Sequence, residues 1–466
     1  MIQFDNSYAR LPAGFFTRTP PTPVREARLL ALNEPLARRM GLDASWLTSP
    51  DGVEMLAGNA LPEGADPIAM AYAGHQFGGF VPQLGDGRAV LLGEVVAPDG
   101  HRFDIQLKGS GPTPFSRRGD GRAWMGPVLR EYLVSEFMAA MGVPTTRSLA
   151  AVATGETVMR EAPLPGAVLT RVASSHIRVG TFEYFAVRGN IEALKALSDH
   201  AIDRHYPHAH GPLTLLDGVI ARQAETIAQW MALGFIHGVM NTDNMAVSGE
   251  TIDYGPCAFM DAYHPDKVFS SIDQMGRYRW SEQPQIAVWN LAQLATCLIP
   301  LMGEREAAIE AATHSVHAFP ALYQAAWLRR FGEKLGISAT PDDRQLIERL
   351  LTLMAEQGAD FTRVFAGLSD GSARDEFTDR AAFDAWAKDW QALQPDALIM
   401  AHANPRRVPR NHRIEQAITA AVAGDLEPFQ RLFDAVTHPR EDREVWRDLS
   451  IAPEPDELVQ RTFCGT

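Results

Sequence analysis

The residue pattern of this chain changes character near residue 190, and this change limits the folds that it can adopt. Before it, short apolar runs alternate with glycine-rich turns. Residues 88–96 and 101–108 flank a Pro-Asp-Gly turn, which predicts a β-hairpin, and residues 148–172 are again strand-like. After it, apolar residues recur at helical spacing. The sequence therefore predicts an α+β fold with a smaller β-rich N-terminal lobe and a large helical C-terminal lobe.

One helix interrupts the β-rich part. Pro127 suits the first turn of a helix, apolar residues follow at helical spacing, and Gly142 and Pro144 end it. Residues 1–70 are rich in proline and turn residues around a helix-like segment at 24–40, so we expect an extension packed on the main body. The predicted division is residues 1–70, 71–185 for the β-rich lobe, and 186–466 for the helical lobe. Within the last part, residues 286–302, 307–331, 342–357 and 380–393 are expected to be helices.

The composition and charge of the chain argue against several classes of protein. The chain has 466 residues and a formal net charge of −14, which argues against a protein that coats nucleic acid. Its N-terminus shows no secretory signal pattern, and its apolar runs are too short or too interrupted to span a bilayer. Its three cysteines form no C-x-x-C pair. We expect a cytoplasmic protein that binds neither nucleic acid nor membrane.

Residues 233–255, LGFIHGVMNTDNMAVSGETIDYG, carry the clearest chemical signal. Asp243 and Asn244 are adjacent, and Asp253 follows nine residues later in an Asp-Tyr-Gly triplet. Oxygen ligands of this kind suit a divalent cation held against phosphates, although a plain turn explains the same residues. The triplet resembles the kinase Asp-Phe-Gly motif, yet the His-Arg-Asp catalytic loop is absent, because His237-Gly238-Val239 has no aspartate.

A second group of residues fits phosphate binding. Lys108 ends a strand-like run and Glu131 lies on the next helix, an arrangement by which kinase-type sites hold nucleotide phosphates. Gly85 to Arg88 form a glycine-rich turn that suits either a phosphate loop or a simple hairpin. Arg171 and Arg178 could clamp an anion, or could be two surface arginines.

Long stretches of the chain resemble the selenoprotein O family, pseudokinase-like proteins that transfer AMP from ATP to proteins. The stretches are YAGHQFGGFVPQLGDGRAVLLGEV (72–95), DIQLKGSGPTPFSRRGDGRAWMGPVLREYLVSEFMAAMGVPTTRSLA (104–150), LTRVASSHIRVGTFEYF (169–185), residues 233–255, and NPRRVPRNHRIEQAI (404–418). The resemblance implies a protein-kinase-like bilobal fold. It also implies transfer of AMP to Ser, Thr or Tyr hydroxyls with release of pyrophosphate, and an ATP whose α-phosphate faces the acceptor.

The resemblance also implies a role for each matching residue. Asp243 is the catalytic base, Lys108 is held by Glu131, and Asn244 and Asp253 bind Mg²⁺, with Mn²⁺ as the alternative. The ATP-binding residues are Gly85, Gly87, Arg88, Lys108, Asp120, Gly121, Arg171, Arg178 and Asp253.

Two questions stay open at the level of sequence. Cys464 occupies the place where some family members carry selenocysteine, and a regulatory disulfide with Cys257 is one hypothesis; two reduced thiols are the other. The activity itself also has alternatives, which are a conventional phosphotransferase and a non-catalytic nucleotide-binding pseudokinase.

Overall fold

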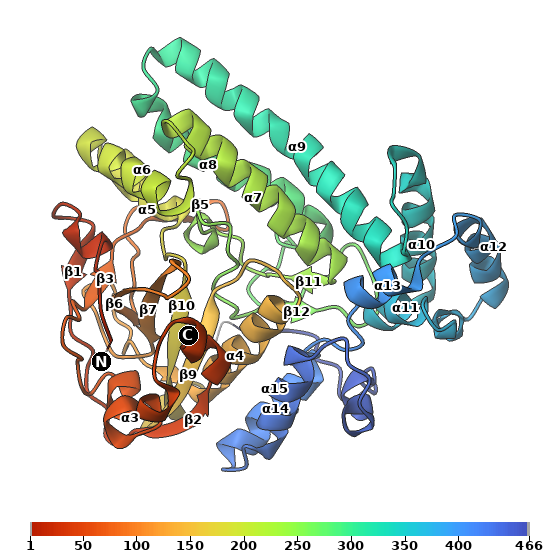
Figure 1. Ribbon diagram of the computed structural model, residues 1–466, viewed down its shortest axis with the longest axis horizontal. Helices are drawn as coiled ribbons and strands as arrows, with labels where there is room; N and C mark the ends of the chain where they lie inside the picture. The colour runs from red at the N-terminus through yellow and green to blue at the C-terminus, as the bar shows by residue number, and fades with distance from the viewer. Residues whose placement is uncertain (1, 464–466) are drawn as a thin grey trace.

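The computed structural model describes residues 2–463 and centres on an eight-stranded antiparallel sheet (Figure 1). The strand order is β1-β3-β6-β7-β10-β9-β2, and β8 pairs with β10. The strands are β1 (Phe16–Arg18), β2 (Arg28–Leu32), β3 (Ile68–Met70), β6 (Ala89–Val96), β7 (Arg102–Lys108), β8 (Ala123–Trp124), β9 (Arg147–Met159) and β10 (Pro163–Ala173). Residues 1–70 thus contribute three of its strands.

Side chains of the central strands alternate between two hydrophobic cores, as the period of two in a strand requires. Ala167 and Leu169 of β10 pack in the core that contains helix α4 (Met125–Ala140). Val168 and Val172 face the other core, which holds the short N-terminal helices. These helices are α1 (Glu34–Arg39), α2 (Ala44–Leu47) and α3 (Pro50–Ala57).

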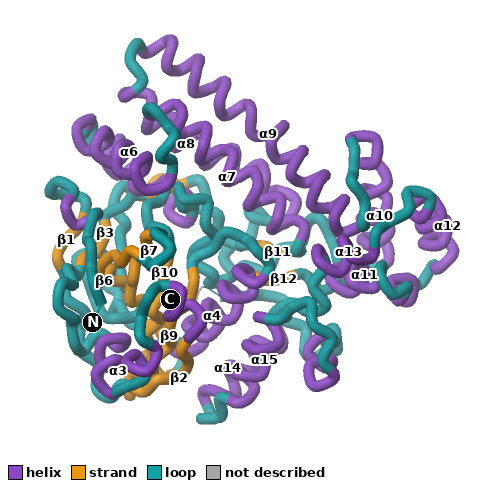
Figure 2. Tube along the Cα trace, in the orientation of Figure 1, coloured by secondary structure: helices purple, strands orange, loops and turns teal. Residues whose placement is uncertain are grey.

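The chain after β10 is mainly helical, apart from the segment between α7 and α8 and the C-terminal part after α15, and most strands gather on one side of the molecule (Figure 2). Its helices are α5 (Val179–Ala186), α6 (Ile191–His205), α7 (Pro212–Ala232), α8 (Gln283–Leu298), α9 (Arg305–Leu335), α10 (Arg344–Gln357), α11 (Phe361–Gly367), α12 (Arg380–Gln391), α13 (Ala397–Ala403), α14 (Asn411–Val422) and α15 (Glu427–Thr437). Helices α7 and α9 pack along each other, and α14 and α15 return to pack on α4.

Two small sheets lie outside the main one and frame the site. Strands β11 (Phe235–Ile236) and β12 (Ala258–Phe259) pair with each other, so they bring together the two ends of the segment that contains Asp243 and Asp253. Strands β4 (Gly74–Gln76) and β5 (Gly79–Val81) form a tight hairpin. In the described part of the chain, no helix is both long and apolar enough to cross a membrane.

The predicted α+β class is confirmed, with its antiparallel sheet and many helices. The predicted helix at 24–40 is wrong in its first half: residues 28–32 form β2, which pairs with β9, and α1 starts only after Asn33. Pairing with β9 overrides the local pattern. The Asn33 side chain accepts a hydrogen bond from the Leu36 amide (3.1 Å) and so fixes the true start of the helix.

Candidate active site

One cavity of about 730 Å³ lies where the sheet, α4 and the 233–255 segment meet. Its lining includes residues of the glycine-rich turn, the end of β7, α4, β10 and the loop between β11 and β12. Twelve of the predicted site residues line it: Gly85, Gly87, Arg88, Lys108, Asp120, Gly121, Glu131, Arg171, Arg178, Asp243, Asn244 and Asp253. Residues from distant parts of the sequence therefore meet in one space.

Four charged residues alternate in sign on one side of the cavity. Lys108 Nζ donates to Glu131 Oε2 (2.5 Å) and to Asp253 Oδ1 (3.0 Å). Arg171 Nη1 donates to the same two partners, at 3.3 Å to Glu131 Oε1 and 2.7 Å to Asp253 Oδ1. Glu136, which faces away from Lys108, instead pairs with Arg147 (2.6 Å). Each cation in this ring thus touches both carboxylates, which compensates charges that are largely removed from water.

Arg178 supplies a third cation. It lies at the N-cap of α5, and its guanidinium is stacked over the Tyr72 ring at 4.4 Å from the centroid. Its Nη2 is 3.6 Å from Asp253 Oδ2, and its Nη1 is 3.5 Å from Asp86 Oδ1. Arg178 is almost completely buried, so its position depends on these neighbours.

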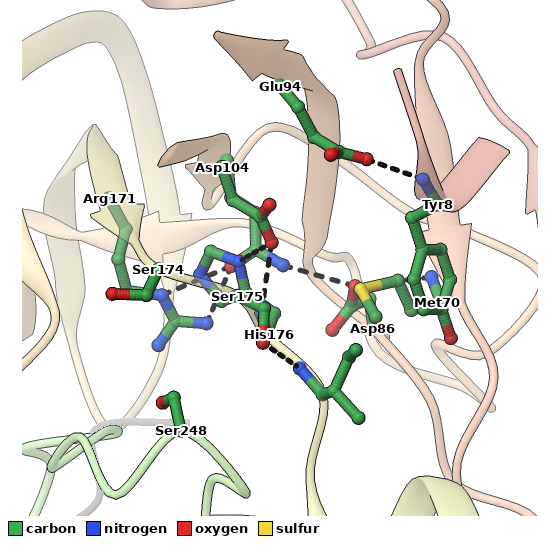
Figure 3. Close-up of polar contacts among 12 residues, drawn as sticks. Tyr8, Met70, Asp86, Glu94, Asp104, Arg171, Ser174, Ser175, His176 and Ser248 are labelled. Atoms are coloured by element: carbon green, nitrogen blue, oxygen red, sulfur yellow. Dashed lines mark hydrogen bonds and ion pairs between the residues drawn. The ribbon is translucent and has the colours of Figure 1, made fainter. Parts of the chain in front are cut away.

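The buried side-chain amide of Gln106 connects Arg171 to Arg178 through Asp86. Gln106 Oε1 accepts from Arg171 Nη2 (2.6 Å), and its amide group donates to Asp86 Oδ2 (3.1 Å). Asp86 also accepts from the Met70 amide (3.2 Å), which anchors it to β3 (Figure 3). The arginines are therefore held in fixed positions by the sheet itself.

Asp253 is ionised in this environment. Burial alone would raise its pKa, but the charges of Arg171, Lys108 and Arg178 outweigh burial and hold the pKa well below its usual range. Its backbone has φ of +62°, a left-handed conformation that aspartate adopts more readily than most residues. The strained backbone and the three cations aim a permanently charged carboxylate into the cavity.

The glycine-rich turn packs against the loop that precedes α4. A side chain at Gly85 would collide with the Phe115 ring, and one at Gly87 would come within 2.9 Å of the Phe115 carbonyl oxygen. On the same loop, Asp120 pairs with Arg160 (2.8 Å), and Gly121 has φ of +66°. These glycines are thus required for close packing of two loops over the cavity.

Asp243 lies apart from this cationic group, in a short 3-10 turn (Thr242–Asn244). Its Oδ2 accepts a hydrogen bond from Gln76 Nε2 (3.1 Å), whereas its Oδ1 is buried and has no hydrogen-bond partner among the described residues. Burial raises the pKa of Asp243 to about 6, against the opposing effects of Gln76 and Arg178. A carboxylate with such a pKa is ionised at neutral pH and still able to accept a proton.

Asn244 follows on the same turn and lines the cavity. Its amide group donates to the Val239 carbonyl oxygen (3.0 Å), so the carbonyl oxygen of the side chain is the atom left for a ligand. Among residues 2–463, no group of three or more His, Cys, Asp or Glu could hold a metal ion unaided. A cation in this cavity would therefore need oxygens from a bound phosphate as well.

Cys257 follows the Asp-Tyr-Gly triplet but does not line the cavity. It is completely buried, its thiol donates to the Tyr254 carbonyl oxygen (3.2 Å), and burial raises its pKa to about 12. Cys464, the other residue of the hypothetical disulfide, lies outside the described residues.

Comparison with known proteins identifies the family of the chain. A sequence model of the family described as protein adenylyltransferase SelO matches residues 1–437. The chain belongs to this family. A protein nucleotidyltransferase YdiU from Roseobacter denitrificans is 62% identical over 99% of both chains. Proteins with the same name from Ruegeria sp. and from Rhodopseudomonas palustris are 61% and 58% identical, each over at least 99% of this chain.

Membership of the SelO family confirms the family predicted from the sequence. It also confirms the predicted class of activity, which is that of a protein adenylyltransferase. This activity implies ATP as a substrate.

Sequence reasoning missed several residues around the two aspartates. Gln76, which bonds Asp243, and Asp86, which bonds Gln106, both line the cavity. Asp86 stands inside the glycine-rich turn, where a turn role accounts for it equally well. Gln76 stands in the run Gly-His-Gln-Phe-Gly, and polar residues between glycines were the one available signal.

Proposed function

We propose that the protein transfers AMP from ATP to Ser, Thr or Tyr hydroxyls of other proteins and releases pyrophosphate, with Asp243 as the general base. The observation that carries this proposal is the division of one cavity into two chemical parts. Three cations surround Asp253 on one side, and a separate carboxylate with a pKa of about 6 lies on the other. The first part suits a polyphosphate, and the second suits removal of a proton.

Lys108, Arg171 and Arg178 are the proposed ligands of the β- and γ-phosphates. Their charges are compensated by ion pairs with Glu131, Asp253 and Asp86. Phosphate oxygens would compete for the same N–H donors, and an arginine can hold two of them at once. Because pyrophosphate is the leaving group, cations placed around it stabilise the negative charge that grows on it during transfer.

Asn244 and Asp253 are the proposed ligands of Mg²⁺, with Mn²⁺ as the alternative. Both residues line the cavity, and they carry one amide carbonyl oxygen and one ionised carboxylate, donors that hard divalent cations prefer. A cation bound there with phosphate oxygens would neutralise charge on the leaving group. Asp253 would then exchange part of its contact with Lys108 and Arg171 for the cation.

Asp243 completes the proposed reaction. The acceptor hydroxyl donates its proton to the Asp243 carboxylate while its oxygen bonds to the α-phosphorus. The bond between that phosphorus and the bridging oxygen breaks, and pyrophosphate leaves. A base with a pKa of about 6 is mostly unprotonated at pH 7 and can still take up this proton.

We also propose that the framework is a protein-kinase-like bilobal fold. A lysine on a strand (Lys108 on β7), a glutamate on the following helix (Glu131 on α4) and a metal-type aspartate (Asp253) meet as they do in kinases. The proposed parts are residues 71–185 as the N-terminal lobe, residues 186–466 as the C-terminal lobe, and residues 1–70 as an extension that adds strands to the sheet. The cytoplasmic location stays a prediction from sequence.

Labelled ATP tests the proposed function. We expect purified protein to transfer label to protein from ATP labelled on the α-phosphate, and no label from ATP labelled on the γ-phosphate. Label from the γ-phosphate alone would show a conventional phosphotransferase, and binding of ATP with no labelled product would show a non-catalytic module. As a control, Asp253→Asn removes one charge from the phosphate side and is expected to reduce transfer at least about 100-fold.

A further inference from the structure

The β4–β5 hairpin lies directly on the segment that carries the proposed base. Three consecutive residues of the hairpin contact three consecutive residues of that segment. The His75 amide donates to Thr242 Oγ1 (2.7 Å), and Gln76 Nε2 donates to Asp243 Oδ2 (3.1 Å). The Phe77 amide donates to Asn241 Oδ1 (3.2 Å). The hairpin and the segment are therefore joined at Asp243 and at the two residues that precede it.

The backbone of the hairpin is held in a fixed position, so the side chain of Gln76 starts from a fixed place beside Asp243. Its turn residues, Phe77 and Gly78, have φ of +52° and +85°, the signs that a tight two-residue hairpin turn requires. The Phe77 amide also donates to the Tyr278 hydroxyl (3.2 Å), which itself donates to Asn241 (2.7 Å). These contacts stabilise a left-handed phenylalanine that would otherwise be unfavourable.

His75 adds a second anchor. Its ring Nδ1 lies 2.5 Å from Glu183 Oε1 on α5, and the other oxygen of Glu183 accepts from Thr242 Oγ1 (2.5 Å). Glu183 thus fixes the hairpin and the catalytic segment to the same helix. A shift of the hairpin backbone relative to the 241–243 segment would break several of these bonds at once.

Both oxygens of Asp243 are closed to an incoming hydroxyl. Oδ1 is buried beside Gly74, where even a methyl side chain would collide with it. Oδ2 accepts the hydrogen bond from Gln76. An acceptor hydroxyl must donate to one of these atoms in order to lose its proton, and Gln76 can swing away whereas the backbone of Gly74 cannot. The amide group of Gln76 therefore marks the position that the acceptor hydroxyl has to take.

We propose that Gln76 is a positioning residue of this reaction: its amide holds the Asp243 carboxylate until the acceptor hydroxyl replaces it, and so keeps water away from the base. The β4–β5 hairpin then forms the acceptor side of the site. This inference rests on the proposed role of Asp243. The reaction that Gln76 suppresses is hydrolysis, in which water gives its proton to Asp243, its oxygen bonds to the α-phosphorus, and AMP and pyrophosphate are released.

Gln76→Ala tests the proposal, with Gln83→Ala as the matched control. Gln83 is exposed and is not among the residues that line the cavity. Two quantities are measured, which are the ratio of free AMP to protein-bound AMP and the KM for ATP. We expect the ratio to rise about tenfold in Gln76→Ala, because water fills the space left by the amide.

The KM for ATP should stay near its wild-type value in Gln76→Ala, because Gln76 bonds Asp243 and not the cations proposed to hold the phosphates. A change that merely loosened the fold would raise this KM as well. Gln83→Ala should match the wild-type protein in both quantities. A wild-type ratio of free AMP to protein-bound AMP in Gln76→Ala would overturn the proposal.

Gln76→Glu provides a second variant of nearly the same shape. An ionised glutamate cannot donate a hydrogen bond to Asp243 Oδ2, so the ratio of free AMP to protein-bound AMP should rise in this variant as well, and an unchanged ratio would overturn the proposal. The experiment also separates the two levels of inference. If the wild-type protein places no AMP on other proteins, the proposed function is contradicted. If the wild-type protein is active and the Gln76 variants behave as it does, only the role of Gln76 is contradicted.

Discussion

At the scale of single residues, the site rests on two aspartates whose surroundings shift their pKa values in opposite directions. Asp253 is surrounded by Lys108, Arg171 and Arg178, which keep its pKa well below the usual range. Burial is the main influence on Asp243 and raises its pKa to about 6. Two carboxylates in one cavity can thus serve different purposes, one as a fixed negative charge and one as a proton acceptor.

The pH dependence of transfer follows from Asp243. Below about pH 6 its carboxylate is protonated and cannot accept the proton of the acceptor, so kcat/KM should fall tenfold for each pH unit. A pH series with the wild-type protein measures this limb. A rate that is flat from pH 5 to pH 8 would show that Asp243 is not the base.

The same raised pKa predicts a cost in stability. The folded-state pKa of about 6 lies above the ordinary value of 3.8, so the buried charge destabilises the fold above about pH 6 and has no such effect below about pH 4. Asp243→Asn should therefore raise the free energy of unfolding by about 2–3 kcal/mol at pH 8, and by little at pH 4. Denaturant unfolding at the two pH values checks this, and equal effects at both would contradict it.

At the scale of secondary structure, the sequence predicted the elements whose patterns are long and regular. Strands β6 and β7, helix α4 and helices α8, α9, α10 and α12 follow the expected ranges closely. The β4–β5 hairpin was not predicted, because each strand has three residues and the run is interrupted by glycines. Its conformation depends on contacts with Asn241, Thr242 and Asp243, which lie more than 160 residues away in the chain.

Gly74 tests the contact between this hairpin and the base. Its φ is not in the left-handed region, so alanine is compatible with the backbone, but a methyl group would collide with the Asp243 carboxylate. Gly74→Ala should reduce transfer at least about 100-fold by displacing the base, at a cost of about 1–3 kcal/mol in stability. Activity is measured by AMP transfer and folding by thermal unfolding. Wild-type transfer in a folded Gly74→Ala protein would contradict the close contact.

At the scale of the whole molecule, the cavity joins the sheet to the helical part of the chain. Gly85, Lys108 and Arg171 come from the sheet side, whereas Asp243, Asn244 and Asp253 come from the segment framed by β11 and β12. The stretches of sequence that resemble the SelO family contain most of the residues that line the cavity, since each motif carries its own chemical signal. The sequence predicted the contact between Lys108 and Glu131, which the structure contains. It could not give the contacts of Arg171 and Asp253 that complete the ring, because they depend on how separate elements pack.

A ligand that contacts both the sheet side of the cavity and the segment framed by β11 and β12 should stabilise the whole chain. At a concentration 100 times its Kd, an ATP analogue with Mg²⁺ should add about 2.7 kcal/mol to the free energy of unfolding and raise the midpoint of thermal unfolding. Lys108→Met, which keeps the length of the side chain but removes its charge, should lose most of this gain at the same ligand concentration. Full stabilisation of Lys108→Met would exclude Lys108 from the phosphate site.

The orientation of bound ATP tests the proposed mechanism most directly. A crystal structure with Mg²⁺ and an ATP analogue that resists cleavage between the α- and β-phosphates would place each phosphorus atom relative to Asp243. We expect the α-phosphorus to lie nearest the Asp243 carboxylate, with the β- and γ-phosphates against Lys108, Arg171 and Arg178. A γ-phosphorus nearest Asp243 would contradict AMP transfer by this site and indicate phosphoryl transfer instead.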